Sequence, residues 1–214
     1  MKLDILSDLH IENESDIKEF ECLGDILVIA GDISKNPDIT TGYLNLLSER
    51  YKAVLFTIGN IELWHHSSIN SVINSVTKNL KKNVYLLDIL KGITVKEANF
   101  CGGIYFSKQF LTPNDSKNLK FHNLSDVLEK LEKKSKSNLH KKIKTLKPKV
   151  IITHYPPLSV LNMEETETRE TSKYETIWIF GHYHQYKKFF ATDKVSKKTL
   201  YVCNCNSKPL TLEL

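Results

Sequence analysis

Oxygen and imidazole donors follow five short apolar runs of this sequence. In an α/β sheet the loops after the carboxyl ends of the strands converge on one crevice, so we expect these donors to meet in space. A lone Asp-x-His or Gly-His pair is common and usually structural. Five such pieces, each at the end of an apolar run, instead indicate one shared site. The seven potential ligands are Asp8, His10, Asp32, Asn60, His154, His182 and His184.

This set of donors suits two adjacent divalent metal ions. Such ions lie about 3.5–4 Å apart and need several nitrogen and oxygen ligands, with at least one carboxylate that bridges them. Imidazole and carboxylate without thiolate suit Mn, Fe, Zn, Ni or Co better than Mg or Ca, and two Mn ions are our first expectation. Glycine precedes Asp32, Asn60 and His182. At these positions a glycine would let the backbone approach the site closely.

The apolar runs themselves are typical of buried strands, and they cover residues 3–6, 26–30, 54–58, 84–87, 150–153 and 177–180. Apolar residues at helical spacing predict helices over 69–80, 124–131 and 139–146, the last ending before Pro148. Residues 100–106 and 200–204 are strand-like and separated by turn residues, which indicates a second sheet of more antiparallel character. The sequence therefore predicts an α/β fold with two sheets and flanking helices, in a single domain over residues 1–214.

The composition is ordinary for a globular protein, with 41% apolar and 26% charged residues. No apolar run approaches the roughly 20 residues that cross a bilayer, and Asp4 and Asp8 lie where a signal peptide would be apolar, so we expect a cytoplasmic protein without a membrane partner. The cysteines lack metal-type spacing and are expected to be reduced, with Cys203 and Cys205 on one face of a strand. The polar segment 162–172 is either a mobile loop over a site or plain surface.

Residues 130–149 hold nine lysines against the single Glu132, although the net charge of the whole chain is only +5. Such a block could contact phosphates. It is also typical of the solvated face of a helix, which is the interpretation we favour. A nucleic-acid site would be expected to carry aromatic side chains as a stacking platform, and the block has none. Nucleic acid therefore stays open as a partner but is not favoured, and the oligomeric state is left open.

The donor motifs stand in "SDLHIE", "DILVIAGDI", "GNIE", "ITHYPP" and "WIFGHYHQ". In this order they match the pattern D-x-H, G-D, G-N-H-[ED], H, G-H-x-H, so over nearly its whole length the chain resembles the calcineurin-like metallophosphoesterases. The segment "YVCNCNSKP" resembles the strand and loop that follow the last motif in small bacterial and phage members. The resemblance implies a four-layer sandwich, in which two β-sheets pack face to face with helices outside.

The resemblance also implies how the metals are held and what they do. One metal would be bound by Asp8, His10 and His184, the other by Asn60, His154 and His182, and Asp32 would bridge them. A water activated by both metals would attack phosphorus in line, so the implied reaction is phosphoester hydrolysis.

The chain departs from the family pattern at Ile61. The family has there the histidine that protonates the leaving oxygen, oriented by the carboxylate that follows, here Glu62. General acid catalysis is typically worth about 10²–10⁴-fold and matters most when the leaving alkoxide is strongly basic. We therefore expect hydrolysis of phosphodiester or pyrophosphate bonds in a small phosphoester or nucleotide-type substrate, with weak activity on alkyl phosphomonoesters. Four residues are expected to take catalytic roles: Asp32, Asn60, Glu62 and His154.

Two histidines that follow Ile61 are candidates for the missing acid. His65 or His66 could reach back to the pocket with Glu62 orienting it, although a solvated helix start is the simpler interpretation. Two other functions also stay open. One is a silenced relative that keeps the metal site to bind a phosphorylated ligand or a partner. The other is a nuclease, which the lysine block suggests and its lack of aromatic residues disfavours.

Overall fold

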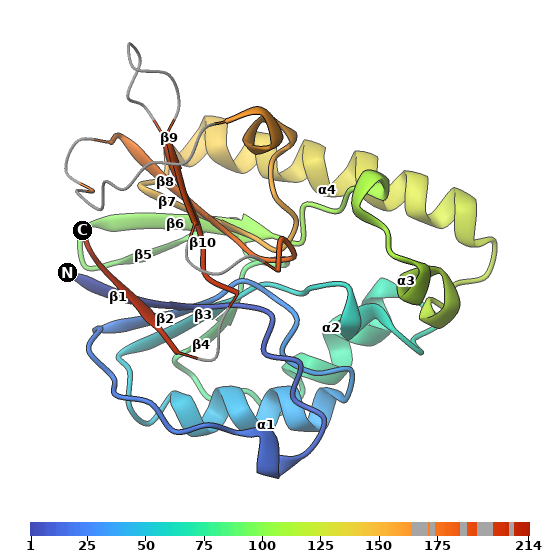
Figure 1. The fold of residues 1–214 in the computed structure, drawn as a ribbon, viewed down its shortest axis with the longest axis horizontal. Helices are drawn as coiled ribbons and strands as arrows, with labels where there is room; N and C mark the ends of the chain where they lie inside the picture. The colour runs from blue at the N-terminus through green and yellow to red at the C-terminus, as the bar shows by residue number, and fades with distance from the viewer. Residues whose placement is uncertain (164–170, 172–173, 185–187, 192–198, 206–207) are drawn as a thin grey trace.

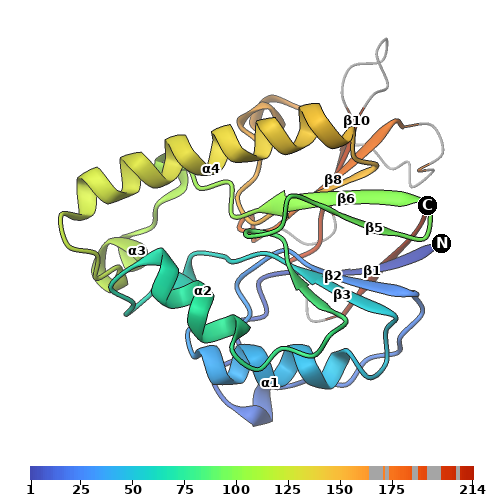
Figure 2. The same ribbon diagram turned by 180° about the vertical axis from the view of Figure 1, so that it is seen from behind.

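Two β-sheets pack face to face in the computed structural model of the chain (Figure 1). The structure describes the chain except for residues 164–170, 172–173, 185–187, 192–198 and 206–207. Most of the polar segment 162–172 therefore lies outside the described residues. Both termini lie at the same end of the sandwich, away from α3 (Figures 1 and 2).

The first sheet has the strand order β11-β1-β2-β3-β4 among the described residues. Strands β1 to β4 run parallel to one another, and β11, at the edge next to β1, pairs antiparallel with β1. They span β1 (Lys2–Leu6), β2 (Ile26–Ile29), β3 (Ala53–Phe56), β4 (Val84–Leu86) and β11 (Leu210–Glu213).

The second sheet has the order β5-β6-β7-β8-β10-β9 in the described part of the chain. Its strands are β5 (Ile93–Val95), β6 (Ala98–Gly103), β7 (Val150–Thr153), β8 (Thr176–Phe180), β9 (Lys188–Ala191) and β10 (Thr199–Cys203). The four central strands are parallel, and only the edge strands β5 and β9 are antiparallel. The second sheet thus has two antiparallel pairings against one in the first, as the sequence predicted, whereas its central strands are parallel because helical crossovers such as the one from β6 to β7 connect parallel strands.

Helices cover both outer faces of the sandwich (Figures 1 and 2). α1 (Pro37–Leu47) and α2 (Ile69–Thr77) lie against the first sheet, and α4 (Leu124–Leu146) lies against the second. The short α3 (Pro113–Asn118) lies beside one end of α4. The predicted α/β fold of two sheets with flanking helices is confirmed.

Three apolar clusters fill the three spaces between these four layers. Leu44 of α1 and Val72 of α2 pack with Phe56 on the outer face of the first sheet. Ile5 and Ile152 belong to the cluster between the sheets, and the cluster under α4 contains Leu139 and Trp178. The central strands of both sheets are therefore buried on both faces, which explains why they are continuous apolar runs rather than alternating patterns.

Three helices differ from the sequence prediction, α1, α3 and α4, and the short α3 was not predicted. The patterns over 124–131 and 139–146 belong to one continuous helix, α4, whose polar middle carries the i,i+4 ion pairs Lys133–Glu129 and Lys136–Glu132 instead of an apolar stripe. α1 was not predicted, because its buried face includes Thr40 and Thr41, which dilute the apolar periodicity.

The lysine block is only partly a solvated face. Lys142 is half-buried, and its Nζ donates to the backbone oxygens of Leu87 and Gly102, 2.8 Å from each. Lys149 donates to the backbone oxygen of Tyr174 at 2.6 Å. Lys142 thus joins α4 to β6 and to the residue after β4, and Lys149 joins the residue before β7 to a residue shortly before β8. Among the described helices, none is long and apolar enough to cross a membrane.

Replacing Lys142 should show this structural role. We expect Lys142→Met to lower the free energy of unfolding by about 1–3 kcal/mol, because two carbonyl groups lose a charged donor. Lys141→Met is the matched control: Lys141 is the exposed neighbour on the same helix, and its replacement should change stability by less than about 0.5 kcal/mol. Urea unfolding of both variants provides the measurement, and equal effects would refute the assignment.

Candidate metal centre

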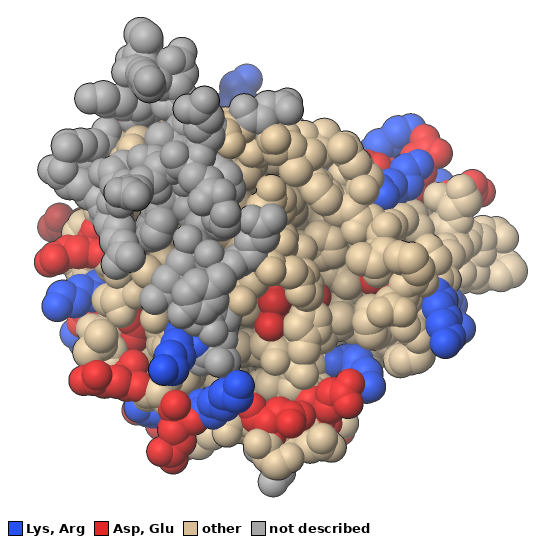
Figure 3. All heavy atoms as spheres, in the orientation of Figure 1, with Lys and Arg blue, Asp and Glu red and all other residues tan. Residues whose placement is uncertain are grey.

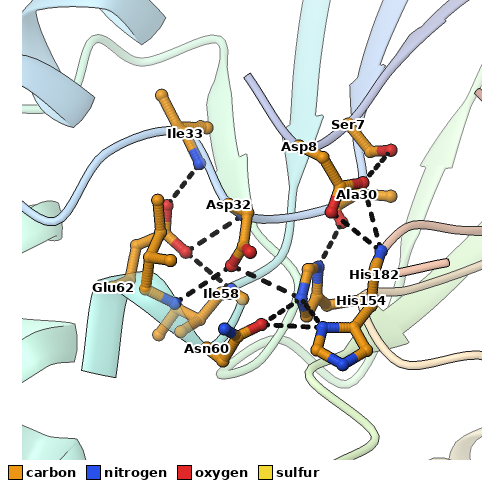
Figure 4. Close-up of polar contacts among 12 residues, drawn as sticks. Ser7, Asp8, Ala30, Asp32, Ile33, Ile58, Asn60, Glu62, His154 and His182 are labelled. Carbon is orange, nitrogen blue, oxygen red and sulfur yellow. Dashed lines mark hydrogen bonds and ion pairs between the residues drawn. The ribbon is translucent and has the colours of Figure 1, made fainter. Parts of the chain in front are cut away.

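All seven predicted donors lie together at the carboxyl ends of β1, β2, β3, β7 and β8. They form two groups that share one residue, Asp32, and within each group the candidate ligand atoms lie within 4.8 Å of one another. Figure 4 shows five of these donors: Asp8, Asp32, Asn60, His154 and His182. The first group contains Asp8, His10, Asp32 and His184, and the second contains Asp32, His154 and His182. The amide oxygen of Asn60 joins the second group, 2.7 Å from His154 Nε2 and 2.8 Å from His182 Nδ1.

The loops that carry these donors adopt an uncommon backbone conformation. Left-handed φ angles occur at Asp8 (54°), His10 (49°), Asp32 (56°), His182 (62°) and His184 (48°). Each such residue costs on the order of 1–3 kcal/mol and persists only where the surroundings fix it. Here backbone hydrogen bonds between the first two loops do so, from Asp8 N to Gly31 O and from His10 N to Asp32 O, both 3.1 Å. The strained loops aim their side chains into one space.

Glycines allow the loops to approach each other, as the sequence predicts. A Cβ atom on Gly59 would lie 2.0 Å from Asp32 Oδ1, and one on Gly31, whose φ is +82°, would lie 2.5 Å from His154 Nδ1. A Cβ on Gly181 would lie 2.7 Å from Asp8 Oδ2. No other residue type fits these distances without moving the backbone.

Backbone carbonyl groups fix the tautomers of the two inner histidines. A carbonyl oxygen only accepts, so the imidazole nitrogen that faces it carries the proton. His154 Nδ1 therefore donates to Ala30 O at 2.8 Å, and His182 Nε2 donates to Phe110 O at 2.9 Å. The remaining nitrogens, His154 Nε2 and His182 Nδ1, turn unprotonated lone pairs toward the site, which is how a metal-binding histidine is prepared.

Several acceptors consequently face one another with no proton between them. His154 Nε2 and His182 Nδ1 are 3.1 Å apart, and the amide oxygen of Asn60 lies against both. His154 Nε2 is also 3.3 Å from Asp32 Oδ1, while Asp32 Oδ2 is buried without a hydrogen-bond partner among the described residues. Lone pairs that converge in this way repel unless a cation lies among them. The donor set therefore fits divalent metal ions.

The electrostatics of the buried groups agree with this fit. Burial lowers the pKa of His154 to about 3 and lowers that of His182, so both imidazoles are neutral and able to bind a metal at neutral pH. Burial, and then the charges of Glu62 and Asp8, raise the pKa of Asp32 well above its ordinary range. An ionised Asp32 needs a positive partner, and a divalent cation supplies one.

Glu62 ties two of the donor loops together. Its carboxylate accepts backbone N–H groups from Gly59 (2.7 Å), Asp32 (3.1 Å), Ile33 (2.6 Å) and Ser34 (3.2 Å). Burial raises its pKa to about 7, and these four bonds pull the pKa downward. Both oxygens are thus engaged with the backbone. The expectation that Glu62 is placed to orient an imidazole has no support in these contacts, which instead fix Asp32 and Asn60 relative to each other.

The neighbours of Glu62 do not supply an evident acid. Ile61 is 4% exposed, and its backbone N–H donates to Asp32 Oδ1 at 3.0 Å. His65 is exposed and its backbone N–H donates to Asn118 O, while His66 Nδ1 lies 3.3 Å from Ser71 Oγ of α2. Neither histidine belongs to the two donor groups.

Contacts from residues 110–115 were missed by the sequence reasoning. Phe110 contributes its carbonyl oxygen to His182, and Asp115 accepts the amide N–H of Asn60 at 2.7 Å. The signature Thr112-Pro-x-Asp115 could have revealed the start of a helix. A backbone carbonyl has no signature of its own, and the contact with Asn60 depends on the tertiary fold.

The fold and the site define a class of protein, an αββα sandwich with a candidate metal centre at its strand ends. Comparison with known proteins gives the family. A family model described as calcineurin-like phosphoesterase matches residues 1–186. The chain belongs to this family, as its motifs indicated.

Among solved structures, the crystal structure of phosphopantetheinyl hydrolase (PptH) from Mycobacterium tuberculosis has a similar fold, with a TM-score of 0.63 over 96% of this chain and 90% of that one at 14% identity. A search of the curated proteins found no match.

Substitution of Gly59 tests the close approach of the loops. We expect Gly59→Ala to destabilise the protein by more than about 1 kcal/mol, because the new Cβ overlaps Asp32 Oδ1 and the adjacent backbone. Gly42→Ala is the matched control, since a Cβ at this position of α1 meets nothing within 4 Å. It should stabilise the helix by about 0.5–1 kcal/mol. Thermal unfolding distinguishes the two, and a harmless Gly59→Ala would contradict the geometry.

Proposed function

We propose that this member of the family is a dinuclear-metal phosphoesterase that hydrolyses phosphodiester or pyrophosphate bonds in small or nucleotide-type substrates. The supporting observation is the pair of donor groups that share Asp32. In this proposal one ion is held by Asp8, His10 and His184, and the other by Asn60, His154 and His182, with Asp32 as the bridge. The metal ions, when bound, would lower the pKa of a water molecule and offset the negative charge of the phosphate.

The chain's own residues divide the remaining work. Neutral His154 and His182 are held in the tautomers that leave one nitrogen free, so no proton has to leave them before a metal binds. Glu62 keeps Asp32 and Asn60 at a fixed separation. Ile61 offers no proton to a leaving oxygen. Leaving groups that depart as stable anions, such as a phosphate or a phenolate, therefore suit the site better than alkoxides.

The nuclease alternative gains little support from the surface. On the face drawn in Figure 3, described Lys and Arg side chains alternate with Asp and Glu around the margin and form no continuous basic band. On α4 two lysines are paired with glutamates, and Lys142 is committed to backbone carbonyls. A small substrate remains the proposal, and a nucleic acid is an outcome that the activity panel tests.

Metal content tests the assignment of ligands. Protein equilibrated with Mn²⁺ and then desalted should carry close to two ions per chain by elemental analysis, since two donor groups are present. Asp32→Ala should lose both ions because it removes the bridge. Glu97→Ala removes an exposed carboxylate in the β5–β6 turn and should retain both. Full occupancy in Asp32→Ala would contradict the assignment, as would a parent protein that binds no metal.

Leaving-group dependence tests the consequence of Ile61. With Mn²⁺ present, kcat/KM should fall steeply as the leaving-group pKa rises across aryl and alkyl phosphodiesters. The panel should also include a pyrophosphate, a short oligonucleotide, and a phosphopantetheine diester, because the similar structure is a phosphopantetheinyl hydrolase. Ile61→His should raise activity on alkyl esters by no more than about 10²-fold, because Glu62 is already engaged. It should change nitrophenyl esters little.

Ile61→Leu is the size-matched control for this series and should leave the slope unchanged. A parent enzyme without any dependence on leaving-group pKa would mean that another group supplies the proton. Absence of turnover on every substrate, with both metals bound, would favour the silenced protein that binds a phosphorylated ligand or a partner.

A further inference from the structure

The side-chain amide of Asn60 has two ends of nearly equal shape but opposite function. Its oxygen can bind a metal, whereas its NH₂ group cannot. In the structure Oδ1 faces His154 Nε2 and His182 Nδ1, and Nδ2 points away from them. The two histidine nitrogens are both unprotonated here, so on their own they would attract the NH₂ end of the amide. Something on the opposite side must hold the amide in the orientation that a metal requires.

Asp115 is the group on that side. Its Oδ1 accepts Asn60 Nδ2 at 2.7 Å and Trp64 Nε1 at 2.9 Å. Its Oδ2 accepts the backbone N–H and the hydroxyl group of Thr112, at 2.9 and 2.8 Å. Asp115 is fully buried, and each of these partners can donate. A carboxylate accepts only, so the NH₂ end of Asn60 is the end that must face it.

The position of Asp115 is itself fixed by local structure. It stands at the third position of α3, and with Thr112 it forms a reciprocal capping box, in which Asp115 N also donates to Thr112 Oγ1. Trp64 holds the same oxygen from the segment that follows Asn60. The carboxylate is therefore held from two separate segments, and it does not depend on Asn60 for its placement.

We propose that Asp115 is a positioning residue for metal binding, which fixes the amide of Asn60 with its oxygen toward the metal site. The inference rests on the proposed two-metal function. Groups that orient a metal ligand are typically worth about 10–100-fold in metal affinity. The competing account is that Asp115 only caps α3, in which case its loss changes stability and leaves the affinity for metal unchanged.

A double-mutant cycle between the two residues distinguishes these accounts. In Asp115→Asn only one side-chain oxygen remains to accept hydrogen bonds from Asn60, Trp64 and Thr112, so the bond that orients the Asn60 amide weakens. We therefore expect the affinity for Mn²⁺ to fall about 10-fold or more. In Asn60→Asp both ends of the ligand are oxygens and need no orientation, but the two carboxylates repel. Adding Asp115→Asn to Asn60→Asp should therefore strengthen Mn²⁺ binding.

The sign of the effect of Asp115→Asn should thus reverse between the two backgrounds, which a helix cap alone does not produce. Titration calorimetry with Mn²⁺ gives the affinities, and thermal unfolding gives the stabilities. Thr112→Val is the matched control: it removes the hydroxyl of the capping box without touching Asn60, so it should lower the melting temperature and keep the Mn²⁺ affinity. If Asp115→Asn alone does not fold, the comparison of Asn60→Asp with the double variant still tests the contact.

The outcomes also separate this inference from the proposed function. A parent protein that binds no Mn²⁺ would overturn the function and the inference together. A parent that binds two ions, with Asp115→Asn changing the affinity equally in both backgrounds or not at all, would overturn the role of Asp115 and leave the metal site standing.

Discussion

The burial of one carboxylate, Asp32, is the constraint on which the rest of the site depends. Oδ1 accepts the backbone N–H of Ile61 and lies near His154, while Oδ2 has no hydrogen-bond partner among the described residues. A charge so placed is costly unless a cation compensates it. Burial of the site raises the pKa of Asp32 and lowers that of His154, and the neighbouring carboxylates of Glu62 and Asp8 raise the pKa of Asp32 further. The converging lone pairs around Asp32 fit a divalent cation.

The surrounding fold keeps this crowding from relaxing. Parallel strands from both sheets end at one edge, and residues with left-handed φ angles turn the chain sharply after β1, β2 and β8. Glu62 then joins the loop of Asp32 to the loop of Asn60 through four backbone N–H groups. Without the glycine at position 59 these loops could not lie so close. Strain in the loops is thus balanced by burial and hydrogen bonding in the layers behind them.

The parts of this structure that the sequence predicts are those with a short-range pattern. Buried strands are continuous apolar runs, and donors directly after them identify the site, including the glycine positions. The parallel pairing of β8 with β10 was not predictable in the same way, because pairing is settled by connections that carry no local signal. The sequence predicted two helices in place of the single long α4, because ion pairs replace the apolar stripe in the middle of this helix. The contacts of Phe110 and Asp115 lie far along the chain from the ligands they hold, so spacing could not reveal them.

At position 61 the backbone and the side chain have different roles. The backbone N–H of Ile61 binds Asp32 Oδ1, and any residue other than proline provides this bond. The side chain is buried and contributes no charge to the metal site. In the proposed function, isoleucine in place of the family's histidine therefore removes a proton donor without disturbing the arrangement of metal ligands. Under the same proposal, metal binding and protonation of the leaving group depend on different residues, so a complete set of ligands is compatible with a narrowed substrate range. The proposed range would then depend on how well each leaving group carries its own negative charge.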